Sequence, residues 1–384
     1  MSLKMKLIYV VESSVPYGAN KCLIEIIDRL DKDKHEVMVV GADEGALSSW
    51  LRERNVSYVS LNHRLSIYPV LNSRKDYLLW LPRLFRRVAL NVIAMVKFFK
   101  ICKRFKPDIV HTNVGPCSLG YFVATYLGIK HVWHVREYQD LDFGMSFFPN
   151  RKAFLKRLKR SDAVICITNS IAAHFHLTDN ENLAVINDGV ISDEKEIDII
   201  QKENYFLFAG RLEAAKGIEE AIESFFEFCE TDSSGISFYV AGDGNFNYLK
   251  KLKEKVSKSN FSNRVRFLGF RDDIFALMRM AKALVVASRC EGFGLITAEA
   301  MYQGTLVIGR DTGGTSEILK DSKGIHYGFL FNSIDELTKL MHEVVDLSPD
   351  EYTKMARSAQ RRTLDKYTIN RNFREISDVY NTLM

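Results

Sequence analysis

The hydrophobic pattern of the chain alternates between short apolar runs and longer amphipathic stretches. The apolar runs are rich in Val and Ile and are apolar on both faces, which predicts parallel strands buried between layers of helices. In the first half of the chain they fall at 7–11, 36–41, 56–61, 108–112, 131–136, 163–168 and 184–186. In the second half they fall at 205–209, 236–241, 265–268, 283–287, 305–308 and 328–331.

Between these runs the apolar residues recur with helical spacing. The pattern predicts helices at 19–30, 47–54, within 77–105, and at 117–127, 151–160, 170–176, 217–230, 246–259, 273–280, 295–302 and 333–345. Alternating strands and helices with short connections predict right-handed crossovers and doubly wound parallel sheets. The polar stretch 191–204 separates two series of similar length. We therefore expect an α/β protein of two Rossmann-like domains that face each other across a cleft.

The composition agrees with a globular protein. Of 384 residues, 47% are hydrophobic and 26% are charged, which excludes disordered and fibrous proteins. The six cysteines include no CxxC pair, so we expect reduced thiols in a cytoplasmic protein and neither a disulfide frame nor a zinc site. Residues 1–11 lead directly into a strand-like run and lack the pattern of a signal peptide.

The net charge of +5 is unevenly distributed. Residues 64–106 contain eleven basic residues and a single acid, Asp76. The uncharged run 88–96 is too short to span a membrane. The basic, aromatic stretch 77–106 and a second basic stretch, 151–160, instead predict peripheral contact with an anionic membrane. The alternative is a long domain helix with its apolar stripe in the core and its basic face in water. Without a recognition motif, nucleic acid is not an expected partner.

A glycine-bounded segment, Gly210-Arg-Leu-Glu-Ala-Ala-Lys-Gly217, directly follows the apolar run 205–209. It holds Arg211 and Lys216 at the end of a predicted strand. A guanidinium fork and an ammonium group together suit a diphosphate, and the glycines let the backbone approach a ligand. The alternative is that both cations decorate a solvent-facing loop.

A second segment, Glu291-Gly-Phe-Gly-Leu-Ile-Thr-Ala-Glu299, follows the run 283–287. The predicted helix 295–302 leaves the N–H groups of Phe293, Gly294 and Leu295 unpaired at its start, which favours an anion site. The carboxylates of Glu291 and Glu299 can accept hydrogen bonds from hydroxyl groups. Alternatively, Glu291 caps the helix and Glu299 is solvated.

Together these segments resemble the retaining glycosyltransferases of family 4, which have the two-domain GT-B fold. GRLEAAKG is similar to the family's GRLxxxKG, and EGFGLITAE to its E-x7-E. Weaker family-like pieces occur in the expected order at 107–113, 185–190, 241–244, 267–270 and 313–318. The resemblance covers nearly the whole chain. It implies an N-terminal acceptor-side domain, 1–198, to which a final helix, about 369–384, returns, and a donor-binding domain, 199–368.

The resemblance also implies roles for these residues. Arg211 and Lys216 would neutralise the donor's diphosphate as it leaves. Glu299 would hold the ribose, and Glu291 the transferred sugar. The remaining donor-binding residues would be Gly18, Gly210, Phe270, Arg271, Gly292, Phe293, Gly294 and Leu295, with Phe270 and Arg271 bordering the base.

No metal or cofactor is expected beyond the nucleotide-diphosphate sugar. The chain contains two DxD matches: 31–33 is interpreted as a helix-to-strand turn and 140–142 as a solvated loop.

Two predictions for the N-terminal half are less specific. Gly18 opens the first helix where phosphates are often bound, although the family usually has a glycine pair there. His134 ends a buried strand, and in the family a histidine at this place touches the donor sugar. The alternatives are a plain helix-start turn at Gly18, and a core histidine satisfied by a backbone carbonyl at position 134. Arg136 and Glu137 could form a local ion pair.

The sequence therefore predicts a metal-independent retaining hexosyltransferase. It would transfer a sugar from a UDP- or GDP-sugar to a saccharide or lipid-linked saccharide, in bacterial surface polysaccharide synthesis. The expected location is the cytoplasm, with peripheral contact at the inner face of the membrane. The alternatives are a GT-B epimerase acting on a nucleotide sugar, and a non-catalytic, membrane-associated GT-B subunit.

Overall fold

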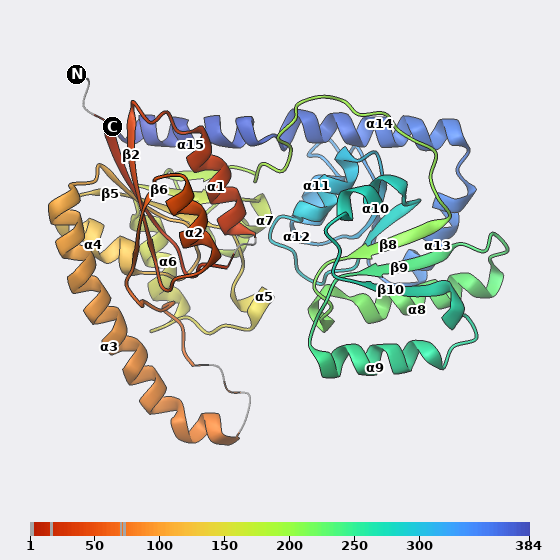
Figure 1. The fold of residues 1–384 in the computed structure, drawn as a ribbon, viewed down its shortest axis with the longest axis horizontal. Coiled ribbons are helices and arrows are strands. Elements are labelled where there is room, and N and C mark those ends of the chain that lie inside the picture. Colours follow the sequence, from red (N-terminus) through yellow and green to blue (C-terminus); the bar gives the residue numbers. More distant parts are fainter. Residues whose placement is uncertain (1–3, 16–17, 70, 72–73) are drawn as a thin grey trace. The chain divides into compact units, whose positions relative to one another are not determined.

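In a computed structural model the chain forms two compact units, and the structure describes residues 4–15, 18–69, 71 and 74–384 (Figure 1). The first unit consists of Met1–Asp188 and Ile369–Met384, and the second of Gly189–Thr368. The sequence-based boundary at 198 lies ten residues later. Residues 193–197 belong to the second unit, because they are bonded to its helices. Tyr302 donates to the carbonyl of Asp193, and Arg357 donates to that of Ile197.

The sheet of the first unit is parallel throughout, with seven strands among the described residues in the order β3-β2-β1-β4-β5-β6-β7. The strands are β1 (Met5–Val10), β2 (His35–Gly41), β3 (Ser57–Ser60), β4 (Ile109–Thr112), β5 (Lys130–Val135), β6 (Ala163–Cys166) and β7 (Leu183–Val185). Its helices are α1 (Ala19–Arg29), α2 (Ala46–Glu53), α3 (Arg74–Phe105), α4 (Leu119–Leu127), α5 (Asp140–Phe143), α6 (Arg151–Arg160), α7 (Asn169–His174) and α15 (Ile369–Leu383).

The second unit is built on the same plan, and its described part contains six parallel strands in the order β10-β9-β8-β11-β12-β13. They are β8 (Tyr205–Ala209), β9 (Ser237–Ala241), β10 (Val265–Gly269), β11 (Ala283–Val286), β12 (Leu306–Arg310) and β13 (Phe329–Phe331). The helices are α8 (Ile218–Thr231), α9 (Phe246–Ser257), α10 (Ile274–Met280), α11 (Leu295–Tyr302), α12 (Gly313–Leu319), α13 (Ile334–Asp346) and α14 (Pro349–Lys366), with short 3-10 turns at Ala214–Lys216 and Ser262–Arg264.

These two doubly wound sheets confirm the predicted α/β fold class. Strands such as β4, β6 and β11 are buried along their whole length, as expected for parallel strands covered on both faces. The amphipathic α15 packs on the first unit. Its Ile376 and Tyr380 are buried in a core shared with β1 and α1, and the hydroxyl groups of Tyr380 and Tyr9 lie 3.0 Å apart.

The long helix α3 has two different halves. Near its C-terminal end, Ala94, Phe98 and Cys102 are buried against the sheet. Toward its N-terminal end, Leu81, Phe85 and other large apolar side chains are exposed, and this half extends away from the sheet (Figure 1). Phe98 lies within the stretch 77–106 that was predicted to contact a membrane, but it is a core residue. In the part of the chain that the structure describes, no helix is long and apolar enough to cross a membrane.

Candidate active site

The loops at the carboxyl edge of the second sheet approach one another closely, because glycine occupies the contact points. A Cβ atom on Gly217 would lie 2.1 Å from the carbonyl oxygen of Ala287. A Cβ on Gly314 would lie 2.0 Å from the carbonyl oxygen of Phe293. Gly217 follows β8, whereas Ala287 and Phe293 follow β11 and Gly314 follows β12. The loops after three strands are thus packed backbone to backbone.

This packing brings the two predicted motifs together. The ammonium group of Lys216 donates to the Glu291 carboxylate at 2.9 Å. The backbone N–H of Arg289 donates to Ala215 at 3.0 Å, and that of Gly314 donates to the Glu291 carbonyl at 2.9 Å. The Arg211 side chain is exposed at the same edge. A half-buried cation and carboxylate beside an exposed guanidinium form a polar surface suited to a phosphate group.

The start of α11 adds hydrogen-bonding groups to this surface. Gly294 precedes the helix with φ +94° and offers no side chain to cap the first N–H groups, which have no acceptor within the helix. The hydroxyl groups of Thr297 and Thr315 are buried and have no partner among the described residues. Both lie within 3.3 Å of where a Gly294 Cβ would be. Buried hydroxyls are normally hydrogen-bonded, so the two threonines place unsatisfied hydroxyl groups beside the start of α11.

Sequence reasoning missed Thr297 and Thr315 as polar contributors, although both lie inside segments that it singled out. Of the other predicted residues, Gly210 and Gly292 flank the same loops, and Glu299 is half-buried on α11. Phe270 and Arg271 follow β10 and are exposed; Arg271 donates to Asp273 through Nε at 2.7 Å and Nη2 at 2.5 Å.

In the first unit, His134 belongs to a buried chain of polar side chains. Its Nδ1 lies 3.2 Å from Nε2 of His111 and 3.4 Å from Nη2 of Arg136. Nδ1 of His111 lies 2.6 Å from the hydroxyl of Tyr380. The alternative interpretation predicted that a backbone carbonyl would satisfy His134, whereas its partners here are side chains. Its Nε2 is buried and has no partner in the described structure.

These contacts define the proton positions on His134. Burial, followed by the nearby Arg136 and His111, lowers its pKa well below the usual value, so the imidazole is neutral. Arginine can only donate, so Nδ1 of His134 accepts, and the ring proton is therefore on Nε2. His134 thus holds an unused N–H donor at the end of β5. One sign of this group of side chains is visible in the sequence, because His111 is a polar residue inside an apolar run.

Arg136 pairs with Asp188 and not with Glu137, contrary to the suggested local ion pair. Its guanidinium donates to the buried Asp188 carboxylate, and its Nε donates to Asn113 at 3.0 Å. Glu137 instead accepts from Gln139 at 2.7 Å. Burial, reinforced by the charges of Asp142 and Glu12, raises the pKa of Glu137 to about 7.

The structure also describes the surroundings of Gly18 and the second DxD match. Gly18 precedes α1 with φ +51°, and, its chain neighbours aside, no atom of the described residues lies within 4 Å of a Cβ built there. The segment 140–142 is part of α5 and not a solvated loop, because both acids have protein partners. Asp140 contacts Arg151 and His174, and Asp142 accepts the N–H of Tyr138 at 2.7 Å.

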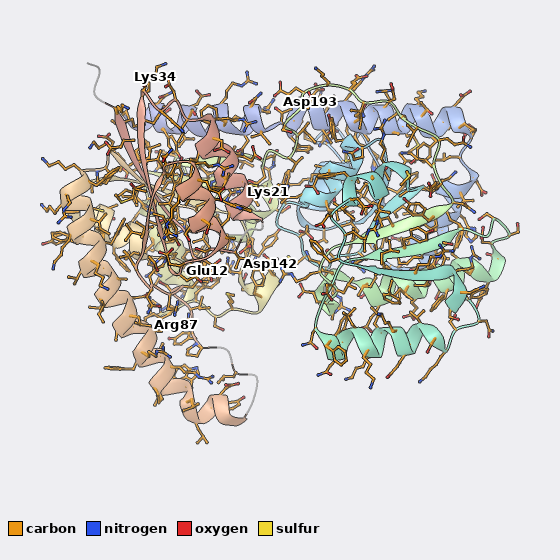
Figure 2. The ribbon with its side chains drawn as sticks, in the orientation of Figure 1. Glu12, Lys21, Lys34, Arg87, Asp142 and Asp193 are labelled. Carbon is orange, nitrogen blue, oxygen red and sulfur yellow. The ribbon has the colours of Figure 1, made fainter. Side chains whose placement is uncertain are left out.

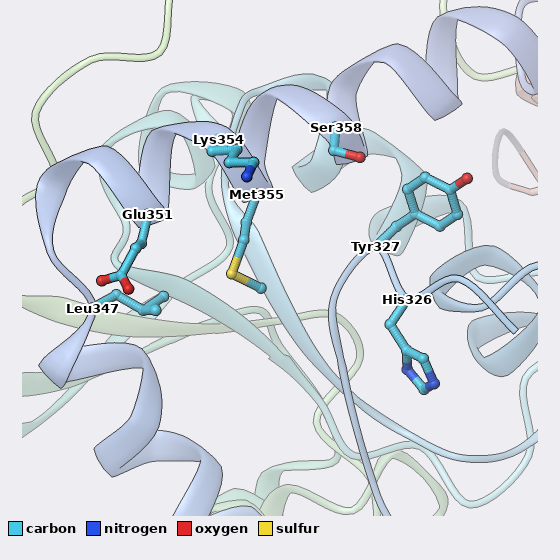
Figure 3. A pocket seen from close by; sticks show the side chains of 7 residues that line it. All are labelled: His326, Tyr327, Leu347, Glu351, Lys354, Met355 and Ser358. Atoms are coloured by element: carbon cyan, nitrogen blue, oxygen red, sulfur yellow. The ribbon is translucent and has the colours of Figure 1, made fainter.

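A separate hollow of about 350 Å³ lies between α14 and the segment before β13 (Figure 3). Its lining includes His326, Tyr327, Met355 and Ser358. None of the predicted site residues belongs to this lining, so we do not assign the candidate site to it.

Two family profiles match consecutive parts of the chain. Residues 16–194 match the profile described as Glycosyltransferase Family 4, and residues 191–362 match Glycosyl transferases group 1. The chain belongs to this family of glycosyltransferases. Its two-domain α/β architecture is the GT-B fold, as the resemblance implied.

Several relatives match the chain over nearly its whole length. An α-1,4-N-acetyl-D-galactosaminyltransferase of Campylobacter jejuni, named for the substrate GalNAc-α-(1→4)-GalNAc-α-(1→3)-diNAcBac-PP-undecaprenol, is 22% identical over 94% of both chains. The UDP-Gal:α-D-GlcNAc-diphosphoundecaprenol α-1,3-galactosyltransferase of Escherichia coli is 21% identical, over 98% of this chain and 97% of that one. The Anabaena HepE crystal structure with UDP is similar with a TM-score of 0.78 and 19% identity, over 98% of this chain and all of HepE.

Proposed function

We propose that this glycosyltransferase moves a hexose-type sugar, with retention of configuration and without a metal ion, from a UDP- or GDP-sugar to a saccharide or lipid-linked saccharide. The observation that carries the proposal is the assembly of Lys216, Glu291 and the start of α11 at one sheet edge. Lys216 and the exposed Arg211 would stabilise the charge that develops on the leaving diphosphate. Relatives named for undecaprenyl-diphosphate-linked acceptors support the lipid-linked class, in bacterial surface polysaccharide synthesis.

Glu299 and Glu291 would accept hydrogen bonds from the donor's ribose and transferred sugar, respectively. The Nε2–H of His134 is a neutral donor, which suits a sugar hydroxyl better than a phosphate. The remaining donor contacts would come from Gly18, Gly210, Phe270, Arg271 and the segment 292–295.

The test is transfer by Lys216→Ala and Glu299→Ala, with a donor first identified by screening UDP-, GDP- and ADP-sugars in the presence of a chelator. Removing one group that stabilises transition-state charge lowers kcat by about 10²–10³-fold, so we expect Lys216→Ala to lose at least that much. Lys251→Ala, an exposed cation on α9, is the matched control. Near-normal rates in both site variants would disprove the assignment, and product NMR would report the configuration.

We also propose that the protein contacts the inner face of an anionic membrane through 77–106 and 151–160. In α3, Tyr77, Leu78, Leu81 and Phe85 are exposed beside basic residues. In α6 the apolar Phe154 and Leu158 are buried, so this helix would contribute only its basic face. Absence of binding to anionic vesicles at low salt would contradict this proposal.

A further inference from the structure

A cavity of about 330 Å³ lies in the first unit beneath α3, away from the predicted donor-binding residues. Small-molecule sites commonly have volumes of about 300–1,000 Å³. One wall is formed by apolar residues of α3, among them Leu84, Val88 and Met95. The opposite wall includes Phe122 of α4 and Phe148. Most of the lining is therefore aliphatic or aromatic.

Two arginines enter this cavity from opposite elements. Arg87 lies on α3 and donates to the carbonyl of Leu65 at 3.2 Å (Figure 2). Arg157 lies on α6, donates to the carbonyl of Phe148 at 3.3 Å, and stands 5.5 Å above the ring of Phe122. The Nε of Arg157 is buried and has no hydrogen-bond partner among the described residues.

The described hydrogen bonds of both guanidinium groups go to backbone carbonyls, and neither arginine forms an ion pair with a described carboxylate. Glu12 acts on Arg87 only as a more distant charge. Partial burial lowers the pKa of both guanidinium groups, as expected where cations lose water without gaining a counter-charge. Such groups are costly to bury unless an anion pairs with them. The cavity therefore combines apolar walls with two cations that lack an anion.

The apolar wall continues onto the exposed surface of α3. Val88 and Val92 line the cavity and are themselves exposed, and Phe85 and Leu81 follow toward the N-terminus at helical spacing. Beside the opening, Tyr68 stacks on Trp80 with ring centroids 5.6 Å apart and meets Phe148 edge-on. Aromatic rings of this kind are common where a protein meets the membrane surface.

We infer that this cavity, defined here as the α3 groove, binds the phosphate or diphosphate of a lipid-linked acceptor together with the first part of its aliphatic chain. Arg87 and Arg157 bind the anionic group, and Val88, Val92 and Met95 contact the chain. The inference rests on the proposed function, because it assigns the lipid part of the acceptor to a site separate from the donor loops.

The probe is farnesyl diphosphate, a soluble isoprenoid diphosphate, measured by calorimetry with the full chain. Farnesol tests the contribution of the isoprenoid chain, and inorganic diphosphate tests that of the anionic group. Phosphatidylglycerol vesicles test adsorption to a bilayer. We expect farnesyl diphosphate to bind more tightly than either fragment. Loss of one charged hydrogen bond corresponds to about tenfold weaker binding, which we expect for Arg87→Gln and for Arg157→Gln.

Two matched controls come from α3 itself. Arg86→Gln removes an exposed neighbour of Arg87 that does not line the groove. Val88→Glu places a negative charge in the groove mouth, whereas Val96→Glu places it on an exposed position outside the lining. Arg86→Gln and Val96→Glu should bind like the unmodified protein, and Val88→Glu should bind at least about tenfold more weakly. Because Val88 is already exposed, this variant tests the groove without emptying the core.

The inference is overturned if inorganic diphosphate binds as tightly as farnesyl diphosphate, or if Arg86→Gln weakens binding as much as Arg87→Gln. It is also overturned if only vesicles bind, or if Lys216→Ala abolishes binding, because the diphosphate would then occupy the donor loops. Retained binding with loss of transfer in Lys216→Ala supports the groove. If the proposed transfer site is wrong, the variants Lys216→Ala and Glu299→Ala will remain active. Binding of farnesyl diphosphate to the α3 groove would be unchanged in that case.

Discussion

The two sheets share one topology, but their carboxyl edges are built differently. In the second unit the edge is made by backbone, since the loops at Gly217 and Gly314 approach carbonyl oxygens so closely that a Cβ would overlap them. In the first unit the edge is made by buried side chains, with Arg136 paired to Asp188 and His134 linked to His111. Backbone packing leaves a motif in the sequence, whereas a buried polar network is distributed over distant residues and leaves none.

The largest effect is expected from breaking the network of the first unit. Arg136→Ala leaves the buried Asp188 carboxylate without its partner, which typically costs about 3–5 kcal/mol of unfolding free energy. Denaturant unfolding, combined with hydrogen exchange resolved by segment, should show lost protection in β4 and β5. Protection in β8 and β9 should be retained, because they belong to the other unit.

The control for this prediction is Arg54→Ala. Arg54 also pairs with an aspartate, Asp28 at 2.7 Å, but both side chains are about one-third exposed. Exposed pairs contribute about 0–1 kcal/mol. If Arg136→Ala were no more destabilising than Arg54→Ala, the first unit's edge would not depend on its buried pair and the comparison would fail.

A somewhat smaller effect is expected from a glycine substitution in the second unit. In Gly217→Ala the new methyl group meets the Ala287 carbonyl at 2.1 Å, and the residue has φ +69°. Overpacking costs about 1–3 kcal/mol, and a left-handed conformation adds about 1–2 kcal/mol. We expect a loss of about 3 kcal/mol, measured by denaturant unfolding, together with weakened donor binding.

Gly18→Ala is the matched substitution in the first unit. Its φ is +51°, but in the part of the chain that the structure describes no atom beyond its chain neighbours lies within 4 Å of the new Cβ. Only the conformational cost of about 1–2 kcal/mol should remain. Equal losses in the two variants would contradict the view that close backbone packing distinguishes the second edge.

The sequence was sufficient to predict most strands and helices, because parallel strands buried on both faces produce compact apolar runs. It also singled out the segments 210–217 and 291–299, in which local backbone geometry requires glycine at Gly217 and Gly294. The meeting of Lys216 with Glu291 then follows from strand order, as both lie after neighbouring strands of the sheet.

The parts that could not be predicted depend on tertiary burial. Arg136 and Glu137 are adjacent in sequence, yet their side chains have different partners. Arg136 pairs with Asp188, and Glu137 accepts from Gln139. Phe98 is an aromatic residue in a basic stretch, as a membrane-facing residue would be, but it lies on the face of α3 that packs into the core. The α3 groove requires Arg87 and Arg157, which are seventy residues apart and meet only after folding.

The last effect depends on pH and concerns a single carboxyl of the first unit, Glu137. Its pKa is raised from 4.5 to about 7, mainly by burial. Between these pH values the unfolded chain releases the proton while the folded chain keeps it, so stability falls as pH rises and levels off above about 7. Glu137→Gln removes this dependence. It should be more stable than the unmodified protein at pH 8, by about 2–3 kcal/mol, and equally stable near pH 4.5.

The measurement is the difference in unfolding free energy between variant and unmodified protein at each pH. Taking the difference cancels the contributions that other groups make to the pH dependence of stability. One such group is His63, whose pKa is lowered to about 4 by burial and whose contribution has the opposite sign. A pH-independent difference for Glu137→Gln would mean that this carboxyl is ionised in the folded state. The first unit's edge would then tolerate a charge as readily as the second, where Lys216 and Glu291 are only partly buried.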